Sequence, residues 1–374
     1  MMKKILSILF FITIVYQCYI IVLPIKEKLL PDYWQRYETL KAVFENSQYS
    51  RKDYQFWIPD ETVYAYAGGA YLKGANPILV ESTQPPVGKY LIALSIMCTN
   101  NENVGILISG ALLLFVIFRI SYSLMHSAVW SLGVVAAFLT EPLFRSQFSY
   151  MPLLDTGFVL MMYLGLLFTH EGVKASKGWL VTLSIIALAL ASQMKVWVSV
   201  LPAIGSVTFF VGVFHWTHMR WLIAGMIASV GVIVFGYTKT LIDGYGILTP
   251  LKVQKYLLWY HTSKVNGIGT IWPLIYLNQW YVWWGDTPVI RDENWSATWL
   301  VVMTGAFATW LGTMKQWVKK RSDETVYILF FLTECAFLTV GQANARYIYP
   351  VLPISYILSA YGFFMLIKLL RKTT

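Results

Sequence analysis

Residues 178–214 read GWLVTLSIIALALASQMKVWVSVLPAIGSVTFFVGVF, and this apolar stretch decides the fold. A helix rises about 1.5 Å per residue and a bilayer core is about 30 Å thick, so one crossing needs about 20 residues. The stretch is too long for a single crossing, and the polar group Gln193-Met194-Lys195 interrupts it. We therefore predict two membrane-crossing helices, 178–193 and 196–214, joined by a turn that contains Lys195.

Apolar runs of similar length recur along the whole chain. They predict an all-α polytopic membrane protein, a single transmembrane domain over residues 1–374 with ten crossings. The predicted crossings are 5–23, 103–119, 125–140, 152–169, 178–193, 196–214, 221–238, 297–313, 326–341 and 347–367. The first run follows Met1-Met2-Lys3-Lys4, as in a signal peptide, but its long apolar core lacks a small-residue cleavage site and favours an anchor.

The composition agrees with a membrane protein. Hydrophobic residues make up 57% of the chain and charged residues 13%, whereas soluble domains are about 45–50% apolar and about 25% charged. An ordinary cytosolic enzyme, a disordered chain and a nucleic-acid binder are thereby excluded. The net charge of +10 is a topology signal, because the basic residues stand between apolar runs. Cys18, Cys98 and Cys335 are too far apart in sequence to indicate a disulfide framework or a metal cluster.

Lysine and arginine in the short loops set the orientation, because they are enriched on the cytoplasmic side. With both termini inside, thirteen basic residues are cytoplasmic: Lys3, Lys4, Arg119, Lys174, Lys177, Arg220, Lys315, Lys319, Lys320, Arg321, Lys368, Arg371 and Lys372. The short outer connections hold only Arg145, Lys195 and Arg346. Two long segments, 24–102 and 239–296, then face outward from the cell membrane.

Acidic residues show on which side chemistry takes place. Fifteen of the nineteen lie outside or at the outer boundary in this topology, and His261 is the one histidine placed there. Side chains that can do acid–base work are therefore concentrated on the extracytoplasmic side, where we expect the active site. Glu334 lies within a predicted crossing, and the sequence assigns it no role.

The first outer segment contains a predicted helix with two carboxylates in its first turn. Asp60 and Glu61 follow Pro59, and carboxylates are favoured at the positive end of a helix. Tyr64 and later small or aromatic residues recur at helical spacing, so we expect the helix to lie along the membrane surface. Adjacent carboxylates point in different directions, so one can accept a proton while the other binds a substrate group. Simple N-terminal capping is the alternative.

A rigid corner follows this helix. Two prolines, Pro85 and Pro86, cannot lie inside a helix and predict a new helix after them. The acidic pair followed by Thr83-Gln84-Pro85-Pro86-Val87-Gly88-Lys89 resembles the protein O-mannosyltransferases of the GT-C class. More distantly, it is similar to the bacterial transferases that move aminoarabinose onto lipid A.

Later segments carry the same resemblance. Leu153-Leu154-Asp155 looks like the second acidic position of these families, and Ala191 to Trp197 resembles their "A-x-x-x-K" turn. Residues 256–261 and 279–288 are similar to a His- and Trp-rich outer loop, and 345–353 to an "R-Y-x-x-P-x-x-P" helix entry. Gln84 departs from the pattern, because the mannosyltransferases have histidine there and the aminoarabinose transferases have lysine. At 374 residues, the chain looks like a family member reduced to its membrane core.

The resemblance implies a reaction. A single sugar, mannose or a similar one, is carried on a polyprenyl or dolichyl monophosphate and passes to a hydroxyl of a protein, glycan or lipid acceptor. It implies Asp60 as the general base and Glu61 as a residue that positions the acceptor. Asp155 orients the acceptor or the sugar, since a carboxylate at a membrane boundary is costly unless it is paired or used. Capping of its helix together with Thr156 is the alternative.

Cations are needed for the departing phosphate. Arg346 ranks first, because a guanidinium offers a planar fork to two phosphate oxygens. Lys195, Lys89 and Arg145 follow, although a lysine at a helix end also reaches toward the interface for solvation alone. Gln84, His261, Tyr64 and Trp283 complete the expected acceptor and sugar site, with membrane anchoring as the alternative for the aromatic residues.

No cofactor or metal is expected to be required, because the outer segments lack histidine and cysteine at metal-ligand spacing. A divalent ion held by carboxylates of distant loops stays open. Two rival functions also remain. One is a transporter of a lipid-linked or small polar solute, in which membrane carboxylates would form a pathway. The other is a structural membrane subunit.

Overall fold

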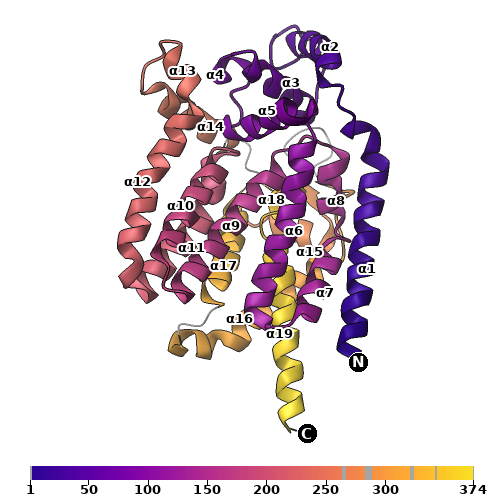
Figure 1. Ribbon diagram of the computed structural model, residues 1–374, viewed down its shortest axis with the longest axis vertical. Helices are drawn as coiled ribbons and strands as arrows, with labels where there is room; N and C mark the ends of the chain where they lie inside the picture. Colours follow the sequence, from indigo (N-terminus) through magenta and orange to yellow (C-terminus); the bar gives the residue numbers. More distant parts are fainter. Residues whose placement is uncertain (1, 263–266, 283–288, 321–323, 342, 374) are drawn as a thin grey trace.

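The computed structural model describes residues 2–262, 267–282, 289–320, 324–341 and 343–373. Helices form nearly all of its regular structure (Figure 1). The elements are α1 (Met2–Val22), η1 (Leu23–Leu29), α2 (Tyr33–Glu45), α3 (Asp60–Leu72), α4 (Pro77–Val80), α5 (Val87–Thr99), α6 (Val104–Met125), α7 (Ala128–Phe138), α8 (Pro142–Ser149), α9 (Asp155–Lys174), α10 (Gly178–Ser192), η2 (Trp197–Val200), α11 (Leu201–Phe209), η3 (Phe210–Phe214), η4 (Trp216–His218), α12 (Met219–Gly236), α13 (Thr238–Ile242), α14 (Thr249–Thr262), α15 (Ile271–Leu277), β1 (Trp280–Tyr281), β2 (Val289–Ile290), α16 (Thr298–Lys320), α17 (Thr325–Val340), α18 (Ala345–Ile348) and α19 (Leu352–Thr373).

The predicted interruption of the long apolar stretch is confirmed. Helix α10 ends at Ser192 and the next helical turn begins at Trp197, so Gln193 to Lys195 form the turn between them. All ten predicted crossings coincide with apolar helices of the structure, namely α1, α6, α7, α9, α10, α11, α12, α16, α17 and α19. The chain is an integral membrane protein.

The lengths of these helices are less uniform than the prediction. Among the described residues, six segments are long and apolar enough to cross a membrane, and the pair α7–α8, bent by 60°, makes a possible seventh. Helices α10 and α17 have 15 and 16 residues, below the roughly 17 that a full crossing takes. The described apolar part of α16 is also short, Thr298–Met314.

The long helices form a bundle with one capped end. Helix α9 packs against α6 and α10, α10 against α12, α11 against α17, and α16 against α19. Helices α2 to α5 gather at one end of the bundle, and both chain termini lie at the opposite end (Figure 1). We call the end that carries α2 to α5 the capped end. Termini on one side agree with an even number of crossings.

Helix α3 is the centre of the cap. It begins at Asp60 after Pro59, as predicted, but Val63 to Ala70 are buried without interruption. Helices α2 and α5 pack against it, so α3 is buried within the cap between these two helices. The Tyr33 hydroxyl donates to the Ala65 carbonyl at 2.8 Å. A Cβ at Gly69 would lie 2.1 Å from that hydroxyl oxygen, so only glycine lets α2 approach this closely.

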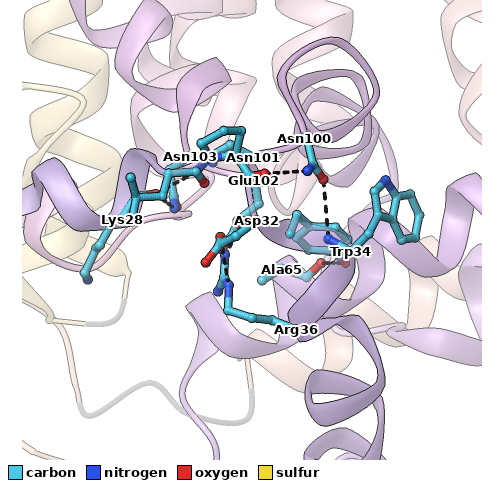
Figure 2. Close-up of polar contacts among 12 residues, drawn as sticks. Lys28, Asp32, Trp34, Arg36, Ala65, Asn100, Asn101, Glu102 and Asn103 are labelled. Atoms are coloured by element: carbon cyan, nitrogen blue, oxygen red, sulfur yellow. Dashed lines mark hydrogen bonds and ion pairs between the residues drawn. The ribbon is translucent and has the colours of Figure 1, made fainter.

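Polar contacts fix the cap to the first long helix of the bundle. Figure 2 shows the network between the segment after α1 and the loop before α6. Asn101 and Asn103 donate to the Lys28 carbonyl at 2.9 and 2.7 Å. Arg36 of α2 holds both oxygens of Glu102 at 3.0 and 3.1 Å. The segment that carries α2 and the start of α3 is thereby held at a defined position.

Candidate functional site

A cavity of about 510 Å³ opens beside the start of α3 at the capped end. Its wall comes from segments far apart in the sequence: the loop after α2, the starts of α3 and α9, the turn after α10, and the ends of α14 and α17. One part of the lining is polar, with Tyr49, Asp60, Tyr64, Thr83, Gln84, Asp155, Lys195, Ser199, Tyr260, Thr262, Glu334, Asn344, Arg346 and Tyr347. The other part is apolar, with Phe158, Val196, Val198, Leu201, Leu258, Phe337, Leu338, Val340 and Pro350.

Arg346 joins the two predicted acidic positions at the centre of this cavity. Its Nη1 donates to Asp60 Oδ2 at 2.9 Å and its Nη2 donates to Asp155 Oδ2 at 2.8 Å. The third donor of the fork, Nε, is buried and has no hydrogen-bond partner among the described residues. The guanidinium therefore holds two carboxylates and keeps a donor unused.

Lys195 extends this row of charges. Its ammonium donates to Asp155 Oδ1, so both oxygens of Asp155 accept from cations. Asp155 is 2% exposed and Lys195 is 9% exposed. Burial lowers the pKa of Lys195, and the carboxylate of Asp155 offsets part of that effect. The sequence Asp60–Arg346–Asp155–Lys195 alternates in sign and sums to zero charge.

Asp60 is the more accessible of the two carboxylates. Its side chain is 36% exposed, against 2% for Asp155. It stands in the first turn of α3, where backbone N–H groups and the helix dipole favour a negative charge. The Tyr49 hydroxyl lies 3.2 Å from Asp60 Oδ1 and donates to it. Tyr49 was missed by sequence reasoning, because a tyrosine in an irregular loop carries no signal of its partner.

Local backbone structure explains why the two cations reach the site. Asn344 caps the short helix α18, where its Oδ1 accepts from the Arg346 N–H at 2.9 Å. The turn after α10 is fixed by a hydrogen bond from the Val87 N–H to the Gln193 carbonyl at 2.9 Å. This bond joins the turn that holds Lys195 to the predicted proline corner before α5, which starts at Val87.

Gln84 and Tyr64 also line the cavity, as the sequence placed them in the site. Gln84 Oε1 is buried and accepts no hydrogen bond from the described residues. Tyr64 is 3% exposed, and burial raises the pKa of its hydroxyl well above the ordinary value. The backbone of His261 belongs to α14, but its side chain lies outside the described structure, as does the whole of Trp283.

Two of the predicted cations lie elsewhere. Lys89 is fully buried, with its ammonium on the Glu81 carboxylate and 2.8 Å from the Gln84 carbonyl oxygen. Arg145 donates to the side chain of Gln17 and to the Leu139 carbonyl. Neither Lys89 nor Arg145 is part of the described cavity wall. The burial of Lys89 supports the corner around Gln84.

Glu61 faces a different space from its neighbour Asp60. It lines a second hollow of about 380 Å³. The lining of this second hollow is Glu27, Lys28, Asp32, Arg36, Leu40, Glu61, Thr62, Ala65, Glu102, Asn103, Met151 and Pro152. The prediction that adjacent carboxylates point in different directions is therefore met by the geometry of α3.

The fold of the chain is similar to that of a solved structure. No protein-family model and no curated protein sequence matches the chain. The crystal structure of ArnT from Cupriavidus metallidurans bound to undecaprenyl phosphate superposes with a TM-score of 0.56 at 15% sequence identity. The match covers 88% of this chain and 59% of ArnT, so the chain spans about three-fifths of the length of that protein. The chain has the GT-C fold.

Two further observations concern the polar groups of the cavity and of the described chain. Glu334 of α17 lines the cavity, is 2% exposed, and its Oε2 has no hydrogen-bond partner among the described residues. Within the same described part of the chain, no three His, Cys, Asp or Glu side chains are grouped so as to hold a metal ion. The independence of metal ions stays a prediction.

Proposed function

We propose that this chain is a glycosyltransferase that moves a single sugar from a polyprenyl-monophosphate donor to an acceptor hydroxyl on the extracytoplasmic side. The observation that carries the proposal is the position of Arg346 between Asp60 and Asp155, in a cavity that continues into an apolar wall. Support also comes from the fold, because ArnT with the same fold was crystallised with undecaprenyl phosphate.

The cavity has the parts that such a donor needs. Arg346 and Lys195 are two cations on the shared carboxylate of Asp155, and the guanidinium of Arg346, whose side chain is 34% exposed, offers N–H donors to phosphate oxygens. Residues such as Leu201, Phe337 and Leu338 supply an apolar surface for a polyprenyl chain. A substrate with a lipid tail also explains why the cavity lies in a membrane protein.

Asp60 acts as the general base in this mechanism. A donor phosphate competes with Asp60 for the Arg346 guanidinium and so releases a carboxylate that was paired. The freed carboxylate accepts the proton of the acceptor hydroxyl, and the hydroxyl oxygen attacks the anomeric carbon. The bond from the anomeric carbon to the phosphate oxygen breaks, and the polyprenyl phosphate leaves with the electron pair, next to Arg346 and Lys195.

Asp155 positions the two cations. It is too buried to meet an acceptor first, and it accepts hydrogen bonds from both cations. It holds the guanidinium of Arg346 and the ammonium of Lys195 next to each other in the cavity wall. We further propose that the sugar is mannose or a similar hexose and that the acceptor is a protein hydroxyl, following the sequence resemblance to protein O-mannosyltransferases.

The experiment that tests the base is the Asp60→Asn variant of the purified full chain, supplied with a panel of polyprenyl-phosphate monosaccharides. Transfer to acceptor is expected to fall by about 10²–10⁴-fold, the usual contribution of a general base. Affinity for undecaprenyl phosphate should not weaken, because Arg346 loses a competitor. Asp53→Asn, in the exposed part of the same loop, is the matched control. Unchanged turnover of Asp60→Asn would remove Asp60 from the mechanism.

The side of the membrane is tested separately. Asp53→Cys in a background without the three native cysteines should react with a membrane-impermeant maleimide in intact cells. Lys177→Cys, near the other end of the bundle, should react only after the cells are lysed. The reverse pattern would place the cavity in the cytoplasm and overturn the proposed orientation.

A further inference from the structure

The two carboxylate oxygens of Asp60 accept from different partners. Oδ2 accepts from Arg346 Nη1 at 2.9 Å, and Oδ1 accepts from the Tyr49 hydroxyl at 3.2 Å. The guanidinium is a cation that a phosphate also attracts, whereas the tyrosine hydroxyl is neutral. A phosphate that draws Arg346 away therefore frees Oδ2 and leaves Oδ1 in its hydrogen bond. The two oxygens of Asp60 are thus unequal before any substrate arrives.

Tyr49 lies where it can keep this contact throughout the reaction. Its partly buried side chain is part of the cavity wall, and it belongs to the loop between α2 and α3. Burial and, to a lesser extent, the carboxylate of Asp60 raise the pKa of the Tyr49 hydroxyl well above the ordinary value. The hydroxyl therefore keeps its proton at neutral and moderately alkaline pH, and it remains a donor to Asp60.

The loop that carries Tyr49 is closed by reciprocal hydrogen bonds. The side-chain amide of Gln48 donates to the Ile58 carbonyl at 2.7 Å and accepts from the Ile58 N–H at 3.0 Å. Tyr49 directly follows Gln48, and Asp60 stands two residues after Ile58. The backbone is therefore fixed next to both members of the Tyr49–Asp60 pair, and their contact does not depend on Arg346.

A carboxylate that loses Arg346 needs another group to keep its orientation. The side chain of Asp60 is 36% exposed, so a released carboxylate has room to turn away from an acceptor. A misplacement of about 1 Å can cost about 10²-fold in rate. A hydrogen bond also makes a carboxylate less basic. Because Tyr49 occupies Oδ1 alone and leaves Oδ2 open, we expect the gain in orientation to outweigh this loss.

We propose that Tyr49 is a positioning residue for Asp60 and that Oδ2 is the atom that takes the proton of the acceptor hydroxyl. This inference rests on the proposed function, because it assigns an atom to the base of that reaction. Arg346 covers Oδ2 until a donor phosphate binds, and Tyr49 holds Oδ1 throughout. The acceptor O–H bond then breaks as Oδ2 takes the proton. The acceptor oxygen bonds to the anomeric carbon, and the polyprenyl phosphate leaves with the electron pair.

Kinetics of the Tyr49→Phe variant test the positioning role. The assay uses the purified full chain, undecaprenyl phosphate mannose as donor and a serine- and threonine-rich peptide as acceptor. We expect kcat to fall by about tenfold or more, the effect of one hydrogen bond to a charged group. The KM for the donor should not change, because Arg346 and Lys195 are retained. Tyr54→Phe, in the same loop and 44% exposed, is the matched control and should leave both constants unchanged. An unchanged kcat, or a loss confined to KM, would overturn the inference.

A double variant separates positioning from a structural role. If Tyr49 acts through Asp60, Tyr49→Phe should lower kcat no further in the Asp60→Asn background, because an amide does not act as the base. A structural role of Tyr49 would lower kcat by the same factor in both backgrounds. Additive losses would therefore overturn the positioning role.

Infrared difference spectra need no turnover and distinguish this inference from the proposed function. The carboxylate band of Asp60 is the band that is missing in Asp60→Asn. It should shift when undecaprenyl phosphate is added, because Arg346 leaves Oδ2, and it should also shift in Tyr49→Phe, because Oδ1 loses its donor. A band that shifts with the lipid but not in Tyr49→Phe overturns the role of Tyr49 alone. A band that shifts in Tyr49→Phe but not with the lipid supports the contact and overturns the proposed donor.

Discussion

The guanidinium of Arg346 donates to Asp60 and to Asp155 at once, across sequence separations of 286 and 191 residues. One side chain thereby joins the start of α3 in the cap to the start of α9 in the bundle. Like charges of two neighbouring carboxylates would repel each other without a cation between them. Arg346 is therefore a structural clamp, and in the proposed mechanism it exchanges the Asp60 carboxylate for a phosphate oxygen of the donor.

Replacing Arg346 with lysine should separate the effect of its positive charge from the effect of its planar fork of donors. Arg346→Lys keeps the positive charge but cannot hold Asp60 and Asp155 with two ends of one planar fork. We expect undecaprenyl phosphate to bind about tenfold or more weakly, because a phosphate loses a bidentate partner. Affinity measured by titration of the purified protein checks this. An affinity equal to that of wild type would show that the phosphate binds elsewhere.

Asp155 and Asp60 should differ in what they do for stability. Asp155→Asn removes the buried carboxylate that the buried Lys195 and the partly exposed Arg346 share, and breaking a buried pair costs about 3–5 kcal/mol. Asp60→Asn removes a carboxylate whose side chain is 36% exposed, so we expect a much smaller change. Unfolding of both variants in mixed micelles measures the difference. Equal loss of stability in the two variants would contradict the separation of a positioning residue from a base.

The ends of several helices that carry site residues could be predicted from the sequence, because neighbouring residues in the chain determine them. Pro59 followed by two carboxylates predicts the start of α3, and the proline pair predicts the corner before α5. The polar group at Gln193 to Lys195 predicts the turn after α10, because a polar interruption in an apolar stretch ends a crossing. These signals come from neighbours in the chain, so no tertiary structure was needed.

Side-chain partners were not readable in this way. Lys89 and Lys195 both follow polar turns near the capped end, yet Lys89 is buried on Glu81 and Lys195 on Asp155. Which cation reaches the cavity depends on how α5 and α10 pack, and a single sequence does not encode that directly. The burial of α3 between α2 and α5 was not predicted for the same reason. The apolar pattern of α2 is too weak to predict which helix it packs against.

The close approach of α2 and α3 gives a test of the cap. Gly69→Ala would place a Cβ 2.1 Å from the Tyr33 hydroxyl oxygen, so the Tyr33 ring or one of the two helices would have to shift. We expect a loss of about 1–3 kcal/mol in the free energy of unfolding, the usual cost of overpacking. Gly231→Ala in α12 is the control, because its Cβ would meet open space. Unfolding titrations should find Gly69→Ala destabilised and Gly231→Ala unchanged or more stable.

The pH dependence of transfer should report the buried lysine. Burial lowers the pKa of Lys195 below the ordinary value of 10.5, so it loses its proton at lower pH than an exposed lysine does. Neutral Lys195 no longer attracts a phosphate, so the transfer rate should fall on the alkaline side at a pH below 10.5. In Lys195→Arg, whose guanidinium stays charged, this alkaline decline should move to higher pH. Rate profiles of the two proteins that coincide would exclude Lys195 from the donor site.

A substitution of Glu334 tests whether this buried carboxyl lowers stability because it is kept for binding substrate. Its carboxyl is 2% exposed on α17, and its Oε2 has no partner among the described residues, which is unfavourable in a membrane protein. Glu334→Gln removes the ionisable carboxyl at nearly equal volume, so we expect the free energy of unfolding to rise by about 1 kcal/mol while transfer falls. Thr333→Val is the matched control.

The neighbouring threonine should behave in the opposite way. Thr333 Oγ1 lies 3.1 Å from the Pro202 carbonyl and 2.9 Å from the Ser206 hydroxyl, so it joins α17 to α11. Its replacement by valine should lower stability and leave the transfer rate of the folded enzyme unchanged. Thermal unfolding of the two variants measures the effect on stability, and transfer assays measure the effect on activity. Together they distinguish a residue that binds substrate from one that stabilises the fold. If Glu334→Gln also proves less stable than wild type and fully active, Glu334 belongs to the scaffold, because its carboxyl then has a structural partner and no ligand.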